Sequence, residues 1–218
     1  MNTIQMDLIH LAMTKHSLSK EQMYKLFNDI VLGDMDDICL AALLSSLKVK
    51  GETPEEIAGA ALALSDNAKS FPRVDYPTAD NCGTGGDGTN TINISTISAI
   101  VAASLGIKMA KHGNRKVSSS TGSADVLSEL GIPLDMDPER AKECLDQTNL
   151  TFLMAPHYHS GIKHAMPVRE ALRTRTIFNI LGPLVNPVKT DINIIGVYDP
   201  ALCLPIAKSL QLLGKKRA

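Results

Sequence analysis

The feature that most constrains the fold is a change of pattern at the two prolines of "SFPRVDYPTAD", residues 70–80. Before this segment, apolar residues recur at helical spacing, and no run is typical of a β-strand. After it, short apolar runs alternate with stretches of helical spacing. The pattern predicts an α/β protein in two parts: a helical bundle domain over residues 1–72 and a mostly parallel α/β domain over residues 73–218.

Two of the helices expected in the first part carry clear signals for where they begin. Ser19 with Gln22, and Thr53 with Glu56, each match the capping box, in which a hydroxyl residue is followed three positions later by Glu or Gln. Pro54 suits a first helical position. The expected helices lie in "NTIQMDLIHLAM", "SKEQMYKLFNDIVLGD", "DMDDICLAALLSSL" and "TPEEIAGAALAL". We find no cluster of residues typical of a catalytic site in this part of the sequence.

The second part predicts a sheet with helices packed against it. Strands are expected at residues 79–82, 107–110, 150–155 and 192–198, and helices near 94–105, 123–131, 138–147, 166–173 and 201–213. Strands that alternate with helices imply right-handed crossovers and a mostly parallel sheet. Ligands bind such sheets at the carboxyl ends of the strands, so the loops after the strands are the places to search for a site.

Composition limits the classes of partner. The 218 residues are 44% hydrophobic and 21% charged with a net charge of −1, which gives no electrostatic reason to expect nucleic acid or a membrane surface. The N-terminus carries an acid where a signal peptide would be basic, and no apolar run approaches the length of a membrane span. Four widely spaced cysteines suit a reducing compartment. We expect a soluble, cytoplasmic protein.

The first candidate loop is "DNCGTGGDGTNTINIST", residues 80–96, between an expected strand and an expected helix. Glycines let backbone N–H groups approach an anion, and the start of a helix adds a favourable field. Thr91, Asn93, Ser95 and Thr96 add hydroxyls and amides that can bind a phosphate or a metal. We interpret the segment as a phosphate-binding loop; the alternative is a flexible turn before a helix cap. It matches neither the G-x-x-x-x-G-K-[ST] nor the G-x-G-x-x-G pattern, so neither an ATPase nor a dinucleotide-binding protein follows.

The second candidate loop, "KHGNRKVSSSTGSAD" at residues 111–125, follows the next strand and should reach the same edge of the sheet. It supplies Lys111, Arg115 and Lys116 together with a run of hydroxyl residues. No Asp or Glu occurs from Gly88 through Ala124. Two adjacent loops with cations and hydroxyls but no acids favour a highly charged phosphate ligand. The alternative is a solvated basic loop.

The third candidate segment is "APHYHSGIKHAMPVREALRTRTIFNILGP", residues 155–183. Its histidines could suggest zinc, but no cysteine or carboxylate stands at ligand spacing, so we interpret them as polar loop residues. These histidines are His157, His159 and His164. An arginine can bind a carboxylate through two parallel hydrogen bonds, which makes the three arginines of the segment candidates. They are Arg169, Arg173 and Arg175, and the residues alone do not single one out.

Three segments carry a resemblance to a known family. "GTGGDGTNTINIST", "KHGNRKVSSSTGSADVLSELG" and "PVREALRTRTIFNILGPLVNP" resemble, in order and spacing, signature segments of the anthranilate phosphoribosyltransferase family. The resemblance covers essentially the whole chain, with small departures at Ile92 and Ser120. It implies the transfer of the phosphoribosyl group of phosphoribosyl pyrophosphate to the amine of anthranilate, with Mg²⁺ and with release of pyrophosphate, in tryptophan biosynthesis.

The resemblance also implies the residues of the site. Anthranilate would contact Gly83, Asn114 and Arg169, and Ser95 would bind Mg²⁺. The residues implied for phosphoribosyl pyrophosphate are Gly83, Gly86, Asp87, Thr91, Asn93, Ile94, Ser95, Thr96, Lys111, His112, Gly113, Asn114, Arg115, Lys116, Val117, Ser118, Ser119 and Ser123. No catalytic residue is assigned, because such a reaction needs two substrates oriented and a leaving pyrophosphate stabilised rather than a nucleophile.

Further expectations concern the extent and the partners of the chain. Chains of the family continue past "LGKKRA" and carry an Asp-Glu pair for magnesium there. We therefore expect an incomplete α/β domain, further acidic ligands beyond Ala218, and weak or absent catalysis by the chain as given. The family implies a homodimer through the helical N-terminal domain. Two alternatives stay open: a pyrimidine nucleoside phosphorylase-like enzyme of related fold, and a truncated, non-catalytic remnant that binds phosphoribosyl pyrophosphate.

Overall fold

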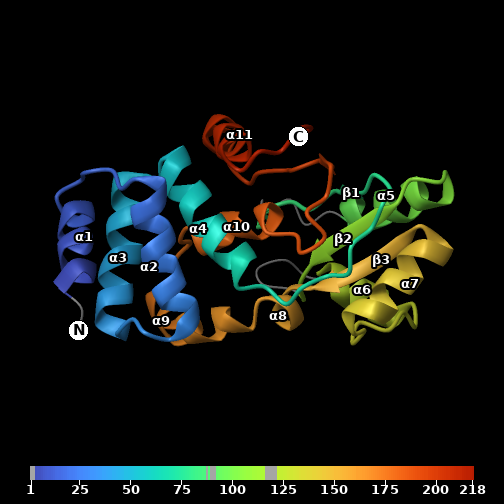
Figure 1. The fold of residues 1–218 in the computed structure, drawn as a ribbon, viewed down its shortest axis with the longest axis horizontal. Helices are drawn as coiled ribbons and strands as arrows, with labels where there is room; N and C mark the ends of the chain where they lie inside the picture. The colour runs from blue at the N-terminus through green and yellow to red at the C-terminus, as the bar shows by residue number, and fades with distance from the viewer. Residues whose placement is uncertain (1–2, 87, 89–91, 116–121) are drawn as a thin grey trace.

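The structure, a computed structural model, describes residues 3–86, 88, 92–115 and 122–218. Figure 1 shows an elongated molecule with a helical lobe at one end and a sheet with its helices at the other. The helical lobe is built mainly from α1 (Thr3–Met13), α2 (Lys20–Leu32), α3 (Asp37–Lys50) and α4 (Pro54–Asp66). These four helices lie within a few residues of the predicted ones, so the prediction for this part is confirmed.

The predicted caps determine where the helices of the lobe begin and end. Ser19 accepts a hydrogen bond from the backbone N–H of Gln22, and Thr53 accepts one from that of Glu56, each within a complete capping box. Gly33 ends α2 with a φ of 82°, a conformation that glycine adopts without steric cost. Local sequence chemistry is therefore sufficient to place these helix ends.

The sheet has four strands in the order β3-β2-β1-β4, and every pairing is parallel. The strands are β1 (Ala79–Asp80), β2 (Met109–Gly113), β3 (Leu150–Met154) and β4 (Ile192–Asn193). The fold class predicted from the sequence, a helical part followed by a parallel α/β part, is confirmed. Beyond β4, Arg217 forms an isolated parallel bridge with Ile192.

β1 and β4 are shorter than predicted, because the residues after them leave the ladder to form a loop-to-loop contact. The backbone N–H of Thr84 donates to the carbonyl oxygen of Gly196 at 2.9 Å. A Cβ placed on Gly83 would lie 3.2 Å from that same oxygen. Residues 194–198 therefore keep the apolar pattern that predicted a strand, but they do not form one.

Helices and short turns connect the strands and join the two ends of the molecule. The helices are α5 (Ile94–Ser104), α6 (Ser123–Glu129), α7 (Pro138–Thr148), α8 (Ala155–Tyr158), α9 (Met166–Leu172), α10 (Phe178–Leu181) and α11 (Cys203–Leu212). The 3₁₀ turns are η1 (Ser160–Ala165), η2 (Gly182–Leu184) and η3 (Pro200–Leu202). Among the described residues, no helix is both long enough and apolar enough to cross a lipid bilayer.

The largest hydrophobic core contains the N-terminal helices together with later segments that return to them. The rings of Phe27 in α2 and Phe178 in α10 lie 5.3 Å apart, and Leu210 of α11 is buried in the same cluster. Gly59 allows α4 to approach α2 closely, because a Cβ there would overlap the carbonyl oxygen of Lys20. The chain thus crosses between the two ends of the molecule several times (Figure 1), and a domain boundary at residue 72 stays a prediction.

Candidate functional site

Two of the predicted loops meet at the carboxyl edge of the sheet. The loop after β1 leads into α5, and the loop after β2 leads into α6. The hydroxyl of Thr96, in the first turn of α5, donates to the hydroxyl of Ser123, the first residue of α6, at 2.9 Å. The starts of two helices therefore lie side by side, and both helix dipoles favour an anion there.

The first turn of α5 carries several of the predicted ligand residues. Asn93 is its N-cap, and Ile94 is exposed. Ser95 is half-buried, and its carbonyl oxygen accepts a hydrogen bond of 2.7 Å from the side chain of Asn81. The hydroxyl of Ser95 is an oxygen donor of the kind that a hard cation accepts.

Lys111 lies beneath the first loop. Its side chain is only 2% exposed, and its ammonium donates to the side-chain oxygen of Asn81 at 3.2 Å and to the backbone oxygen of the same residue at 3.4 Å. Asn81 in turn donates to the first turn of α5, as described above. Lys111 thus places a buried positive charge beside the glycine-rich loop. Asn81 is not marked by any local sequence pattern, because its partners are distant in the chain.

A buried carboxylate, Asp80, stands at the end of β1. It accepts hydrogen bonds from the backbone N–H of His112 at 3.3 Å and from the side chain of Asn186 at 2.8 Å. The same amide of Asn186 donates to the carbonyl oxygen of Ala110 at 2.8 Å, so it joins β1 to β2. Burial raises the pKa of Asp80 to about 6, and the hydrogen bond from Asn186 and the charge of Lys111 only partly oppose this rise. Neither residue was predicted as part of the site; the one local signal, for Asp80, is an acid at the end of a buried strand.

His112 points away from Lys111, as adjacent residues of a strand must. It is buried, and its Nδ1–H donates to the carbonyl oxygen of Gly182 at 3.0 Å. Its Nε2 has no hydrogen-bond partner in the described part of the chain. Burial lowers the pKa of His112 to about 3, so the ring is neutral at physiological pH.

The histidines of the third segment do not share one environment. His159 is buried rather than a polar loop residue as interpreted: its Nε2 is 2.9 Å from the carbonyl oxygen of Val185, and its ring lies 5.3 Å from that of His112. His157 instead pairs with Asp135 at 3.1 Å. Burial of His159 follows from the return of this segment against β2, which a local pattern does not reveal.

The second loop combines a tightly packed glycine with exposed polar residues. A Cβ on Gly113 would lie 2.8 Å from the buried ring of Phe152, so a larger residue there would force that ring to move. Asn114 is exposed, and its side-chain oxygen accepts from the backbone N–H of Arg115 at 2.8 Å. The Arg115 guanidinium lies 3.5 Å from Asp125. Asp87, Thr91, Lys116, Val117, Ser118 and Ser119, all predicted site residues, lie outside the described residues.

Arg169 stands on α9 with a half-buried guanidinium. The group lies 5.0 Å above the ring of Phe178 and donates to the sulfur of Met166 at 3.5 Å. Burial lowers the pKa of Arg169 from its ordinary value. No carboxylate lies within ion-pair distance of it among the described residues. A half-buried cation without an anionic partner in the described part of the chain is suited to bind a carboxylate supplied by a ligand.

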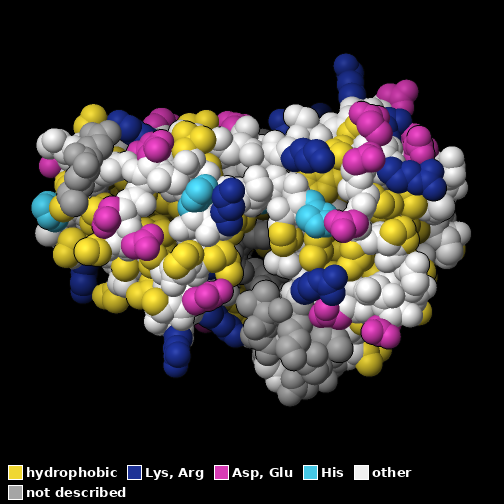
Figure 2. All heavy atoms as spheres, turned by 90° about the horizontal axis from the view of Figure 1, so that it is seen from below, with side chains coloured by type: hydrophobic (Ala, Val, Ile, Leu, Met, Phe, Trp, Pro, Cys, Tyr) yellow, Lys and Arg dark blue, Asp and Glu magenta, His cyan; other side chains and the backbone are white. Residues whose placement is uncertain are grey.

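Arg175, in the third candidate segment, also contacts the glycine-rich loop. It donates a hydrogen bond to the carbonyl oxygen of Gly86, and its guanidinium lies 4.0 Å above the ring of Tyr198. On the face drawn in Figure 2, basic and acidic side chains alternate over both halves of the molecule. The described residues of this face therefore form no broad patch of a single charge.

Two family models match the chain. The model described as the glycosyl transferase family helical bundle domain matches residues 6–68, and the one described as the glycosyl transferase family a/b domain matches residues 75–218. This chain belongs to that glycosyl transferase family. Its two matched segments follow each other in the same order as the helical and α/β parts of the structure.

Relatives of this chain include bacterial proteins of one name. Anthranilate phosphoribosyltransferase of Aeromonas hydrophila is 58% identical over 200 residues, which cover 92% of this chain and 58% of the relative. The protein of the same name from Pseudoalteromonas translucida is 58% identical over 210 residues, which cover 96% of this chain and 59% of the relative. The chain thus spans less than two thirds of the length of these relatives.

Solved structures with the same name share the fold. Anthranilate phosphoribosyltransferase from Thermus thermophilus superposes with a TM-score of 0.91 at 40% identity, and the match covers 95% of this chain and 63% of the Thermus chain. The enzyme from Saccharomyces cerevisiae in complex with phosphoribosyl pyrophosphate and Mg superposes with a TM-score of 0.90 at 28% identity. The match covers 100% of this chain and 65% of the yeast chain.

Proposed function

We propose that this protein acts as an anthranilate phosphoribosyltransferase, the enzyme of the second step of tryptophan biosynthesis from chorismate. It would transfer the phosphoribosyl group of phosphoribosyl pyrophosphate to the amine of anthranilate and release pyrophosphate. The observation that carries the proposal is the junction of the two loops, where Thr96 and Ser123 join the starts of α5 and α6. The 58% identity to relatives of that name supports it.

Phosphoribosyl pyrophosphate would lie along the two loops. The hydroxyls of Ser95 and Ser123, in the first turns of α5 and α6, are suited to hold its phosphate oxygens. Lys111, buried beneath the loop, would contribute long-range attraction. We include the predicted residues of both loops that lie outside the described residues, and the exposed Arg115, in the same binding site.

Anthranilate would be held by its carboxylate. Arg169 offers a half-buried guanidinium. Moving the anthranilate carboxylate out of water costs free energy, and a cation that is already in position offsets this cost. Asn114 and Gly83 would complete the contact, as the resemblance implies. An aromatic amine is neutral at pH 7, so it can attack the anomeric carbon without a strong base.

Magnesium fits the donor set only in part. Mg²⁺ is commonly held by one or two protein oxygen ligands together with substrate phosphates. Among the described residues, Ser95 offers a hydroxyl, and no group of three or more His, Cys, Asp or Glu side chains is placed to hold a metal. We propose that Ser95 is a protein ligand and that substrate phosphates supply most others. When bound, the ion would stabilise charge that develops on the leaving pyrophosphate.

The residues of this chain would therefore act by binding and orientation. The loop amides and hydroxyls would fix the phosphates and Arg169 would fix the acceptor, so that two bound substrates replace a bimolecular encounter. The function is tested by fluorescence detection of phosphoribosyl-anthranilate. Product formation that depends on both substrates supports the proposal. Phosphorolysis of thymidine or uridine without that product would instead indicate a nucleoside phosphorylase.

Arg169→Ala should weaken anthranilate binding by a factor of about 10 to 100, because a charge-assisted hydrogen bond contributes about 1.5–3 kcal/mol. Affinity for phosphoribosyl pyrophosphate should change less than threefold, since that ligand lies on the other loops. Titration of anthranilate fluorescence measures the first value and calorimetry the second. Arg173→Ala, an exposed arginine of the same segment, is the matched control. Equal losses for both ligands would contradict the assignment.

We further propose a homodimer through the helical lobe. On α3, Ile38 is 80% exposed and Val49 is 75% exposed, and their spacing of about three helical turns puts them on one face. Ile4 and Leu11 add exposed apolar side chains on the adjacent α1. Such a face is typical of subunit contacts.

Ile38→Asp should convert the dimer to a monomer, because it places an unpaired charge in the apolar contact. Sedimentation equilibrium at about 50 µM is a suitable measurement, since an interface of standard size commonly holds below that concentration. Asp37→Asn, exposed on the same helix, controls for the change of charge. A monomeric unsubstituted chain at this concentration would refute the homodimer.

A further inference from the structure

Arg175 joins three segments that are far apart in the sequence. It follows α9, it donates to the carbonyl oxygen of Gly86 in the glycine-rich loop, and its guanidinium stacks over Tyr198 at 4.0 Å. Tyr198 belongs to the segment after β4. A planar guanidinium can stack on a ring through its face while its edge donates hydrogen bonds, so the two contacts are compatible.

The segment that carries Tyr198 is itself bound to the same loop. The backbone N–H of Tyr198 donates to the hydroxyl of Thr84 at 3.0 Å, and the backbone N–H of Thr84 donates to Gly196 at 2.9 Å. Gly83 is close enough to Gly196 that a Cβ would lie 3.2 Å from its carbonyl oxygen. Residues 83–86 are therefore held along one side by residues 196–198 and at their end by Arg175.

The loop needs such external contacts, because its own residues resist order. Gly85, Gly86 and Gly88 all have positive φ values, of 67°, 73° and 73°. Glycine populates many conformations when unfolded or unbound, so ordering it opposes binding. A loop that is already held in its bound conformation avoids this cost when a ligand arrives.

We propose that Arg175, stacked on Tyr198, is a positioning residue for the phosphate-binding loop. By fixing the Gly86 carbonyl, it orients the backbone N–H groups that the loop presents to the pyrophosphate group of the substrate. The inference rests on the proposed function for the identity of that ligand. Neither the family resemblance nor the sequence pattern had distinguished Arg175 from its neighbouring arginines.

The test compares Arg175→Ala and Arg175→Lys with Tyr198→Phe, which keeps the ring. Calorimetry measures the affinity for phosphoribosyl pyrophosphate, and hydrogen exchange by NMR measures the protection of the Thr84 amide. We expect both Arg175 variants to lose at least tenfold in affinity and at least tenfold in Thr84 protection, because lysine cannot stack and donate in the same way. Tyr198→Phe should match the unsubstituted protein. Arg140→Ala, exposed on α7, is the control.

The outcomes separate this inference from the proposed function. If the unsubstituted chain does not bind phosphoribosyl pyrophosphate, the proposed function fails, and Thr84 protection still decides whether Arg175 holds the loop. Affinity and protection within twofold of the unsubstituted protein in Arg175→Ala would overturn the inference. Loss of protection in the amides of β2 as well would also overturn it, because it would show a general structural role.

Discussion

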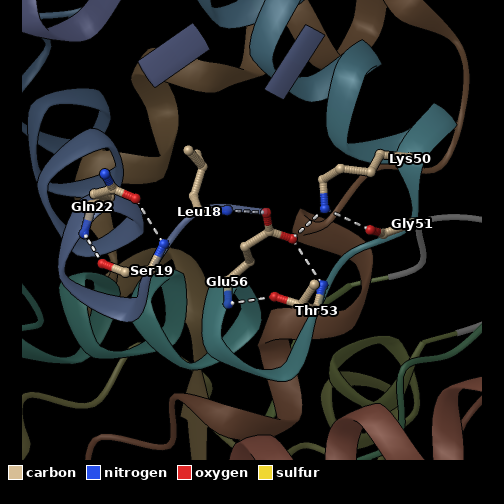
Figure 3. A network of polar contacts seen from close by, with 7 residues as sticks. All are labelled: Leu18, Ser19, Gln22, Lys50, Gly51, Thr53 and Glu56. Atoms are coloured by element: carbon tan, nitrogen blue, oxygen red, sulfur yellow. Dashed lines mark hydrogen bonds and ion pairs between the residues drawn. The ribbon is translucent and has the colours of Figure 1, made fainter. Parts of the chain in front are cut away.

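Replacing Glu56 with alanine is expected to cost the protein about 3–5 kcal/mol of unfolding free energy, the range for breaking a buried ion pair. The carboxylate is completely buried, and its partner Lys50 has a side chain only 7% exposed. One carboxylate oxygen accepts from the backbone N–H of Leu18 at 2.8 Å. The other accepts from Lys50 and from the backbone N–H of Thr53, each at 2.8 Å (Figure 3).

The size of this effect follows from what the substitution leaves behind. Without the carboxylate, a buried ammonium loses its counter-charge, and two backbone N–H groups lose their acceptor. Leu18 lies two residues before α2, whereas Lys50 and Thr53 lie on either side of the turn between α3 and α4. Glu56 therefore holds three helix ends of the lobe together, in addition to its role in the cap of α4 (Figure 3).

Urea unfolding followed by circular dichroism measures the effect. Glu56→Gln keeps one acceptor and loses the charge, so an intermediate loss of about 2–3 kcal/mol is expected. Glu55→Gln, one position earlier and exposed, is the matched control and should change stability by less than about 0.5 kcal/mol. A loss below about 1 kcal/mol in Glu56→Ala would show that water or a rearranged side chain replaces the carboxylate.

The Glu56 network illustrates which part of the fold the sequence predicts. Thr53 and Glu56 are three residues apart, and this spacing alone identifies the helix start and the capping box. The contacts with Leu18 and Lys50 depend on how helices pack, and no local spacing encodes them. The same limit explains β4: residues 192–198 have a strand-like apolar pattern, but Gly196 is engaged by Thr84 from another loop.

The candidate site divides in the same way. The glycine-rich and basic loops could be placed at one edge of the sheet, because parallel strands end there together. The sequence places Lys111 and His112 in the loop, since the expected strand ends at residue 110. In the structure both lie in β2, where adjacent side chains point to opposite faces. Asp80 and Asn186, which lie 106 positions apart, become neighbours only through the fold.

Asp80 and His112 should make opposite contributions to the pH dependence of stability. The pKa of Asp80 is raised from 3.8 to about 6, so its contribution is fully present below about pH 4 and is lost as the pH rises through 6. The pKa of His112 is lowered from 6.5 to about 3, so its contribution is present above pH 6.5 and is lost as the pH falls. Between pH 4 and 6 the two slopes oppose each other.

Asp80→Asn removes the pH dependence of stability that comes from Asp80 and leaves the one that comes from His112. One pKa unit corresponds to about 1.4 kcal/mol, and Asp80 alone should lose about 2 kcal/mol of stabilisation between pH 4 and 6. The unfolding free energy of Asp80→Asn should therefore rise across this range by about 2 kcal/mol more than that of the unsubstituted protein. The side-chain NH₂ of the introduced asparagine would face a hydrogen-bond donor. This mismatch lowers the unfolding free energy at every pH and does not change its slope against pH.

Urea unfolding at pH 4, 5 and 6 measures the slopes, and carboxyl groups common to both proteins cancel in the difference. His112→Gln is the reciprocal variant: its unfolding free energy should rise less between pH 4 and 6 than that of the unsubstituted protein, because the His112 contribution is gone while those of Asp80 and His159 remain in both proteins. The charges of Lys111 and Lys215 act on Asp80 in every variant, so they shift its pKa without producing these differences. Parallel slopes in Asp80→Asn and the unsubstituted protein would show that Asp80 ionises in the folded protein near its ordinary pKa, and that solvent reaches the end of β1.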